Sequence, residues 1–181
     1  MAKDTATAVF GGGCFWCTEA IFNELRGVTS VISGYAGGKK DDPTYDQVSM
    51  GNTGHAEVVQ VAFDPAVISY DTLLEVFFAT HDPTTMNRQG GDVGTQYRSV
   101  IFTTNDAQAA AARAYIAKLE AGEHAGKNIV TEILPLVRFS TAEEYHQKYF
   151  EKNADSNPYC SVVIVPKLKK LREKFAPLLK G

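Results

Sequence analysis

The stretch ATAVFGGGCFWCTE, residues 6–19, carries the strongest local pattern in this chain. Its apolar first part, Ala6 to Phe10, predicts a β-strand, and the three glycines that follow allow the backbone to turn sharply. Cys14 then stands in the first turn of a predicted helix that runs to Leu25. Unpaired backbone N–H groups and the helix dipole stabilise an anion at such a position. We therefore expect the Cys14 thiol to have a lowered pKa and to ionise at neutral pH.

Further strands and helices are predicted beyond this stretch. Period-2 alternation indicates strands, and apolar residues at helical spacing indicate helices. The expected strands are residues 28–34, 55–63, 96–102, 130–139 (broken by Pro135) and 162–165; the expected helices are residues 69–80, 107–120, a helix capped by Ser140 or Thr141 that ends at Phe150, and a basic helix at the C-terminal end. The polar segment from His81 to Thr95 lies between them, and an irregular segment of this length usually has a functional reason.

This order of elements predicts an α+β fold, a two-layer sandwich with a split βαβ (ferredoxin-like) core and long irregular C-terminal and loop extensions. The 181 residues contain no repeat and no linker, so residues 1–181 are expected to form a single catalytic domain. The net charge of −3 gives no reason to expect nucleic acid or membrane as a partner, and no run approaches the ~20 apolar residues of a membrane span. The N-terminus has no signal-peptide pattern, so we expect a cytoplasmic location, and a monomer.

The chain has three cysteines, Cys14, Cys17 and Cys160, an odd number that argues against a secreted disulfide framework. Cys14 and Cys17 lie at i, i+3 on one helix face, with Cβ atoms about 5–6 Å apart. A disulfide needs about 3.8 Å, so a modest local movement would join them. A C-x-x-C pair beside a βα turn is a thiol–disulfide redox pattern, although Cys17 could also be a packed core residue. A zinc site is hard to assemble, because one further cysteine and no His pair at ligand spacing are available.

Six motifs follow one another in the order GGGCFWCTE (11–19), SGYAGG (33–38), PTYDQV (43–48), NTGHAEVVQVAFDP (52–65), QGGDVGTQYRS (89–99) and AEEYHQKYF (142–150). Together they resemble the peptide methionine sulfoxide reductase A family, from about Val9 to Phe150. The resemblance implies thiol-dependent reduction of methionine-S-sulfoxide, free or in oxidised proteins, to methionine. It implies no bound cofactor and no metal, and thioredoxin as the external dithiol reductant.

The resemblance also implies the catalytic residues. Cys14 matches the nucleophile, which attacks the sulfoxide sulfur and becomes a sulfenic acid as methionine leaves. Glu57 matches the acid that protonates the sulfoxide oxygen, and Tyr45 and Tyr97 match two phenols that hold this oxygen. Without the resemblance, Glu57 would be interpreted as an exposed strand carboxylate and the tyrosines as core aromatics. The alternation of strand 55–63 allows Glu57 to face inward, where burial would raise its pKa enough for proton donation at pH 7.

The substrate pocket and the resolving thiols follow from the same resemblance. Phe15 and Trp16 match aromatic walls around the substrate S-methyl group, and Asp92 matches a carboxylate that organises the pocket. The structural alternative for Phe15 and Trp16 is core packing, and for Asp92 it is a turn position beside two glycines. The resemblance to members with a CFWC motif favours Cys17 as the first resolving thiol, after which Cys160 would enter the disulfide. Cys160 departs from the pattern of many members, because it follows Asn-Pro-Tyr instead of lying in a Gly-rich tail, and it could also be a buried residue at a strand edge.

Two other functions stay open on the sequence. A general C-x-x-C thiol–disulfide oxidoreductase or redox sensor requires only Cys14 and Cys17. It leaves the matched glutamate and tyrosines without a role. A metal-binding module would use the cysteines to hold zinc. We expect His55, His81 and His146 to be structural residues.

Overall fold

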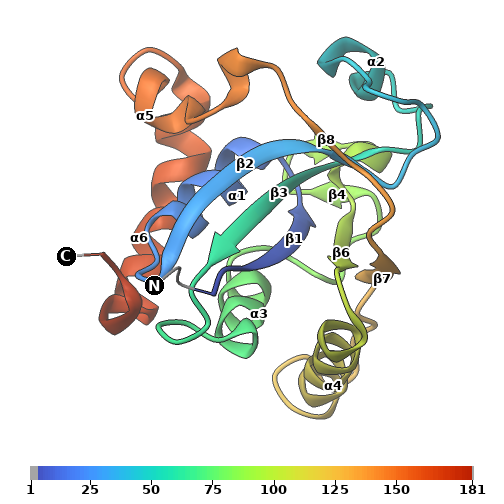
Figure 1. Cartoon of the computed structure of the whole chain (residues 1–181). Coiled ribbons are helices and arrows are strands. Elements are labelled where there is room, and N and C mark those ends of the chain that lie inside the picture. The colour runs from blue at the N-terminus through green and yellow to red at the C-terminus, as the bar shows by residue number, and fades with distance from the viewer. Residues whose placement is uncertain (1–3, 181) are drawn as a thin grey trace.

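A six-stranded sheet forms the centre of the computed structural model, which describes residues 4–180 (Figure 1). The spatial order of its strands is β7-β6-β1-β3-β2-β8. Their bounds are β1 (Ala6–Gly12), β2 (Val28–Ala36), β3 (Ala56–Phe63), β6 (Ser99–Thr103), β7 (Glu132–Pro135) and β8 (Phe139–Thr141). The apolar run at the start of the chain therefore supplies a strand in the middle of the sheet, flanked by β3 and β6.

The four middle strands form the predicted split βαβ core. The helix α1 (Phe15–Asn23) joins β1 to β2, and β3 inserts between these two strands, antiparallel to both. The helix α3 (Tyr70–Ala79) follows β3, and the chain then reaches β6, which pairs antiparallel with the other side of β1. The resulting order β6-β1-β3-β2 is that of a ferredoxin-like sheet, so the predicted fold class is confirmed. The outer strands extend it, β7 parallel to β6 and β8 antiparallel to β2.

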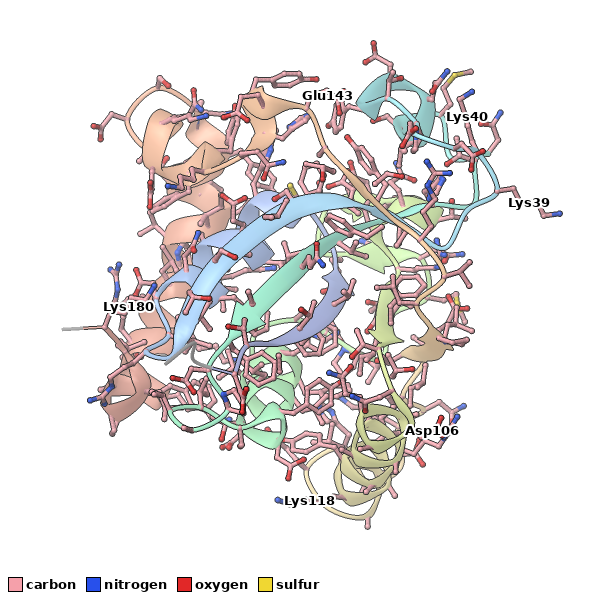
Figure 2. The ribbon with its side chains drawn as sticks, viewed as in Figure 1. Lys39, Lys40, Asp106, Lys118, Glu143 and Lys180 are labelled. Atoms are coloured by element: carbon pink, nitrogen blue, oxygen red, sulfur yellow. The ribbon has the colours of Figure 1, made fainter. Side chains whose placement is uncertain are left out.

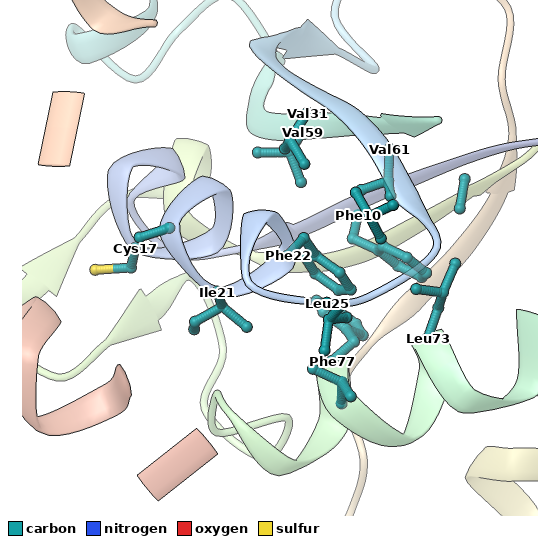
Figure 3. Packing of buried hydrophobic residues seen from close by; sticks show 14 of the residues in the cluster. Phe10, Cys17, Ile21, Phe22, Leu25, Val31, Val59, Val61, Leu73 and Phe77 are labelled. Atoms are coloured by element: carbon teal, nitrogen blue, oxygen red, sulfur yellow. The ribbon is translucent and has the colours of Figure 1, made fainter. Parts of the chain in front are cut away.

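The main hydrophobic core fixes α1 against the sheet. Phe10 of β1 stacks on Phe22 of α1 with ring centroids 5.2 Å apart, and on Phe77 of α3 at 4.8 Å. All three rings are buried, and Figure 3 shows them together, with the thiol of Cys17 pointing away from them at the other end of α1. Each aromatic pair contributes about 0.5–1.5 kcal/mol beyond its area burial. The core therefore determines where the first turn of α1, and Cys14 before it, are held.

The opposite face of the sheet is also covered. A smaller cluster of buried residues consists of Val9, Ala36, Ala56, Val58, Val100 and Phe102. The partly buried side chains of Leu134, Leu136 and Phe139 pack against it. Burial on both faces explains why β3 reads as an almost continuous apolar run in which Glu57 is an exception.

Side-chain caps set the starts of three helices. Ser69 caps α3 and Asn105 caps α4 (Asp106–Ala121), each by accepting a hydrogen bond from the backbone N–H three residues on, at 3.1 and 2.8 Å. Both helices were predicted to within one residue of these bounds. A third helix, α2 (Tyr45–Ser49), begins with a capping box at Thr44 and was not predicted from the sequence.

The helix expected to run from Ser140 or Thr141 to Phe150 is wrong. Both residues belong to β8, and the chain continues as a 3₁₀ turn (Glu144–His146) and the short helix α5 (Tyr149–Asn153). The Gln147 side chain explains the interruption. Its amide accepts a hydrogen bond from Ser33 N–H at 2.9 Å and donates to the Ser33 carbonyl, also at 2.9 Å, which ties this segment to the edge of β2.

The strand expected at residues 162–165 is wrong as well. A π-helical turn (Cys160–Ile164) leads directly into the helix α6 (Val165–Lys174). Ile164, Leu168 and Leu171 are buried at helical spacing, whereas Val162 is 71% exposed. A short apolar run alone does not distinguish the two-residue period of a strand from the 3.6-residue period of a helix. The packing of α6 against α1 decides in favour of the helix.

Two further boundaries differ from the expectation. Residues 130–139 do not form one interrupted strand, because β7 and β8 pair at opposite edges of the sheet. The strand expected from residue 96 begins at Ser99, after a 3₁₀ turn (Thr95–Tyr97). The polar segment from residue 81 to 95 contains only two short strands, β4 (Arg88–Gln89) and β5 (Asp92–Val93), which pair with each other. A last 3₁₀ turn spans Ala176–Leu178.

Most charged side chains lie at the periphery of the molecule, and Glu19 and Glu57 are buried exceptions. Figure 2 shows Lys39, Asp106, Lys118 and Lys180 extending outward from loops and helix ends. In the part of the chain that the structure describes, none of the helices combines the length and the apolar composition needed to cross a bilayer.

Candidate active site

Cys14 is the N-cap residue of α1, directly after the glycine turn. Its backbone is extended (φ −61°, ψ 127°), and its carbonyl accepts the first helical hydrogen bond, from Cys17 N–H at 3.1 Å. The turn requires glycine at position 13, where φ is +103° and a Cβ atom would lie 2.9 Å from the Gln89 side chain. The predicted place of Cys14 at a helix N-terminus is therefore confirmed, and the residue is half-buried.

Glu57 of β3 lies under the start of the same helix. The side chain is only 1% exposed, and its Oε1 atom accepts a hydrogen bond from Phe15 N–H at 3.1 Å. The other oxygen, Oε2, is buried and has no partner among the described residues. Burial raises the pKa of Glu57 to about 8, against the smaller lowering effect of the Phe15 N–H. At neutral pH the carboxyl is therefore mostly protonated and has a proton to donate.

The expected lowering of the Cys14 pKa is wrong for this structure. Burial raises the pKa of the Cys14 thiol well above its ordinary value, and the neighbouring thiol of Cys17 and the charge of Glu57 add to this effect. The backbone N–H of Trp16 acts in the opposite direction but is outweighed. The two thiols share a proton, and the hydrogen bond from Cys14 lowers the pKa of Cys17 to about 7. The first negative charge therefore settles on Cys17, where the charge of Lys167 also favours it.

Tyr45 and Tyr97 lie on the same side of the site as Glu57. Tyr45 begins α2, and Tyr97 ends the 3₁₀ turn before β6. Burial raises the pKa of both phenols, and the charges of Glu57 and Cys14 raise them further. Both hydroxyls therefore remain protonated donors, close enough to Cys14 and Glu57 to interact with them electrostatically.

Aromatic rings surround the first turn of α1. Phe15 is fully buried, with its ring 6.5 Å from Tyr45, whereas Trp16 is half-buried and stacks on Tyr149 at 3.7 Å. Trp16 donates its indole N–H to Nδ1 of His146 at 3.0 Å. His146, expected to be structural, thus orients the indole ring of Trp16. Sequence spacing gave no sign of this contact, because 130 residues separate the two partners.

The candidate resolving thiols, those of Cys17 and Cys160, are both buried. Cys17 is 2% exposed, and its sulfur lies 3.5 Å from the hydroxyl of Tyr159, which donates to Oδ2 of Asp92 at 2.8 Å. Cys160 is fully buried in the π-helical turn, and all three cysteines are free thiols. Burial raises the pKa of Cys160, and the charge of Cys17 adds to it. Tyr159 was not identified from the sequence, although it directly precedes a cysteine that was.

A cleft of about 750 Å³ opens beside these groups. Its lining includes Cys14, Gln89, Asp92, Tyr159 and Lys167. The structure thus brings the candidate residues together from six separate segments, and Cys14 interacts with both a buried acid and a second thiol. Among residues 4–180 there is no group of three or more His, Cys, Asp or Glu side chains arranged to hold a metal ion.

Comparison with known proteins gives consistent matches. The sequence profile of the peptide methionine sulfoxide reductase family matches residues 6–178. A peptide methionine sulfoxide reductase MsrA from Haloquadratum walsbyi is 60% identical over 173 residues, which cover 96% of this chain and 98% of the relative. The crystal structure of reduced Mxr1 from Saccharomyces cerevisiae superposes with a TM-score of 0.77 at 37% identity, covering 86% of this chain and 91% of Mxr1. Mxr1 in complex with Trx2 superposes with a TM-score of 0.56 at 27% identity, covering 82% and 89%.

Proposed function

This chain belongs to the peptide methionine sulfoxide reductase family, and we propose that it reduces methionine-S-sulfoxide, free or in proteins, with Cys14 as the nucleophile. It is a thiol-dependent methionine sulfoxide reductase that takes its electrons from thioredoxin, in line with the complex of the related Mxr1 with Trx2. The chain acts as a single catalytic domain and a monomer in this proposal. The finer steps below depend on the contacts around Cys14.

The buried, unpartnered Oε2 of Glu57 is the observation that carries the proposal. A protonated carboxyl without an acceptor has an unfavourable free energy in a water-poor site, and a bound sulfoxide oxygen would satisfy it. Tyr45 and Tyr97 supply further donors on the same side. Sulfoxide sulfur becomes electrophilic only when its oxygen is protonated or strongly hydrogen-bonded, which is the environment these three residues provide.

The first step oxidises Cys14. Glu57 donates its proton to the sulfoxide oxygen as the Cys14 sulfur attacks the sulfoxide sulfur. Two electrons pass from Cys14 to the substrate, the methionine S–O bond breaks, and the oxygen ends on Cys14 as a sulfenic acid. The thiol proton of Cys14 replaces the one that Glu57 has given. Because the resting thiol is neutral, its activation depends on this coupled transfer and not on a thiolate formed beforehand.

The second step resolves the sulfenic acid. Cys17 shares a proton with Cys14 and carries the first thiolate of the pair, so it is placed to form the Cys14–Cys17 disulfide with release of water. Cys160 lies close enough for the charge of Cys17 to raise its pKa. Its sulfur then attacks the Cys14–Cys17 disulfide, so that a new S–S bond forms to one of these two sulfurs, the old S–S bond breaks and the other sulfur is released as a thiol. Thioredoxin then reduces the protein disulfide with its own two thiols. Phe15, Trp16 and Asp92 form the walls of the substrate site in this proposal.

The test is an assay with a mixture of both methionine sulfoxide epimers and dithiothreitol, followed by chiral chromatography. We expect the S epimer to be consumed, the R epimer to remain, and Cys14→Ser to be inactive. An active Cys14→Ser variant, or consumption of neither epimer, contradicts the proposal. A parallel insulin-reduction assay distinguishes a general thiol–disulfide oxidoreductase, which would reduce insulin without consuming either epimer.

A further inference from the structure

The hydroxyl of Tyr159 connects two groups that the proposed function leaves separate. It lies 3.5 Å from the sulfur of Cys17, and it donates its proton to Oδ2 of Asp92 at 2.8 Å. Because that proton is directed at Asp92, a Cys17 thiol in this arrangement donates its S–H to the Tyr159 oxygen. The three groups therefore form a directed chain from thiol through phenol to carboxylate.

The ring of Tyr159 is held firmly in this place. It meets the face of Trp16 edge-on, with centroids 5.8 Å apart. Its backbone N–H donates to the Asn157 side chain at 2.9 Å, and Asn157 in turn donates to the hydroxyl of Tyr149 at 2.6 Å. Tyr149 stacks on Trp16, so this series of contacts links Tyr159 to the helix α1, which begins directly after Cys14 and contains Cys17. The hydroxyl is thus oriented before any reaction begins.

We propose that the Tyr159 hydroxyl is a catalytic group of the resolving step, which takes the proton of the Cys17 thiol and passes its own proton to Asp92. This inference rests on the proposed function, because it requires a sulfenic acid on Cys14. The Cys17 sulfur then attacks the Cys14 sulfur, the S–S bond forms and the S–OH bond breaks. The leaving hydroxide takes the proton of Glu57 and departs as water, and Asp92 returns its proton to solvent, from which Glu57 recovers one. Cys17 is oxidised and the sulfenic sulfur is reduced.

The charged and titratable groups around Cys17 come from several elements. Cys14 and Tyr159 form hydrogen bonds with the Cys17 sulfur. The charge of Lys167 on α6 favours the Cys17 thiolate, and the charge of Asp92 on β5 disfavours this thiolate. Cys160 faces it from the π-helical turn. The hydrogen bond from the Cys14 thiol is the largest cause of the lowered pKa of Cys17, and this cause is lost once Cys14 has become a sulfenic acid, so the Cys17 thiol then needs a proton acceptor. The need grows as the pH falls.

The experiment compares Tyr159→Phe with its parent, both carrying Cys160→Ser so that only Cys17 can pair with Cys14. In a single turnover without reductant, released methionine measures the first step. The loss of free thiols, with dimedone trapping of the sulfenic acid read by mass spectrometry, measures the second. We expect disulfide formation to be slowed about 100-fold at pH 6, within the usual size of a general-base contribution, and methionine release to be slowed much less, because the first step does not use the Tyr159 hydroxyl as a base. The defect should shrink as the pH rises to 9.5, where solvent ionises the thiol.

Tyr115→Phe is the matched control, because this tyrosine lies on α4 and stacks on Phe78 outside the chain of three groups. It should leave both steps unchanged. The inference is overturned by an unchanged rate of disulfide formation in Tyr159→Phe, by equal slowing of both steps, or by a defect of the same size at every pH. Absence of methionine release in the parent itself would instead contradict the proposed function.

Discussion

Glu57 is the residue whose protonation the chemistry depends on. Its carboxyl keeps a proton at neutral pH because burial outweighs the single N–H that would stabilise the charged form. Removing the proton without changing the shape is possible with Glu57→Gln. We expect kcat/KM for the S sulfoxide to fall by about 10²–10⁴-fold, the range for loss of a general acid. Steady-state kinetics measures it, with Glu120→Gln, an exposed glutamate on α4, as the control.

The same residue sets the expected pH dependence. The active form of Glu57 is the protonated one, and its pKa is about 8, so kcat/KM should decline as the pH rises above 8. The decline should be absent from the residual activity of Glu57→Gln. A wild-type profile that is flat to pH 10, or one that rises through pH 8, would show that the carboxyl does not act as the acid.

At the scale of elements, the segment between β8 and α5 is held by one side chain. The Gln147 amide makes both hydrogen bonds to Ser33 and donates to the Ala142 carbonyl at 3.0 Å. Gln147→Met keeps the length and leaves these backbone groups without partners, at a cost of about 1–3 kcal/mol each where water cannot replace the bond. We expect the free energy of unfolding in urea to fall by at least about 1–3 kcal/mol, because Ser33 is fully buried and water cannot readily replace the bonds to it.

Glu144→Ala, in the same segment but exposed, is the control for this substitution and should change stability by less than about 0.5 kcal/mol. Equal midpoints for Gln147→Met and Glu144→Ala would show that the segment is held by something other than this amide.

For the whole molecule, the buried side chains of His81 and Glu57 set the limits of the pH range of greatest stability. Burial lowers the pKa of His81 to about 4, so its contribution is present above pH 6.5 and is lost as the pH falls toward 4. The raised pKa of Glu57 acts in the other direction, because its contribution is present below pH 4.5 and is lost as the pH rises through 8. Between about pH 4.5 and 6.5 the two effects cancel and stability is greatest; it falls by about 1 kcal/mol below this range and by about 2 kcal/mol above it.

Urea unfolding at pH 5.5, 7 and 9 measures this dependence. Stability should decrease from pH 5.5 to pH 9 in the wild type, and the decrease should be smaller in Glu57→Gln, which has no proton to lose. An identical slope in both proteins would mean that Glu57 does not contribute to the alkaline loss.

Local patterns were sufficient for the core of the fold. Local sequence preferences agree with the tertiary structure in β1, in β3 and in the capped helices α3 and α4. The segments after residue 140 were mispredicted because distant contacts override propensity there. Gln147 pairs with β2, and the buried spacing of Ile164 and Leu168 makes a helix of a run that also fits a strand.

The sequence by itself determined the split βαβ core, the position of Cys14 at a helix start and, through ordered motifs, which side chains to examine, because these depend on short-range period and turn chemistry. Only the tertiary structure decided how the protons are distributed among them. The pKa values of Cys14, Cys17 and Glu57 depend on burial and on partners far along the chain, Tyr159 among them. Desolvation and electrostatic interaction act through space, so a helix dipole inferred from position alone predicted the wrong direction for Cys14.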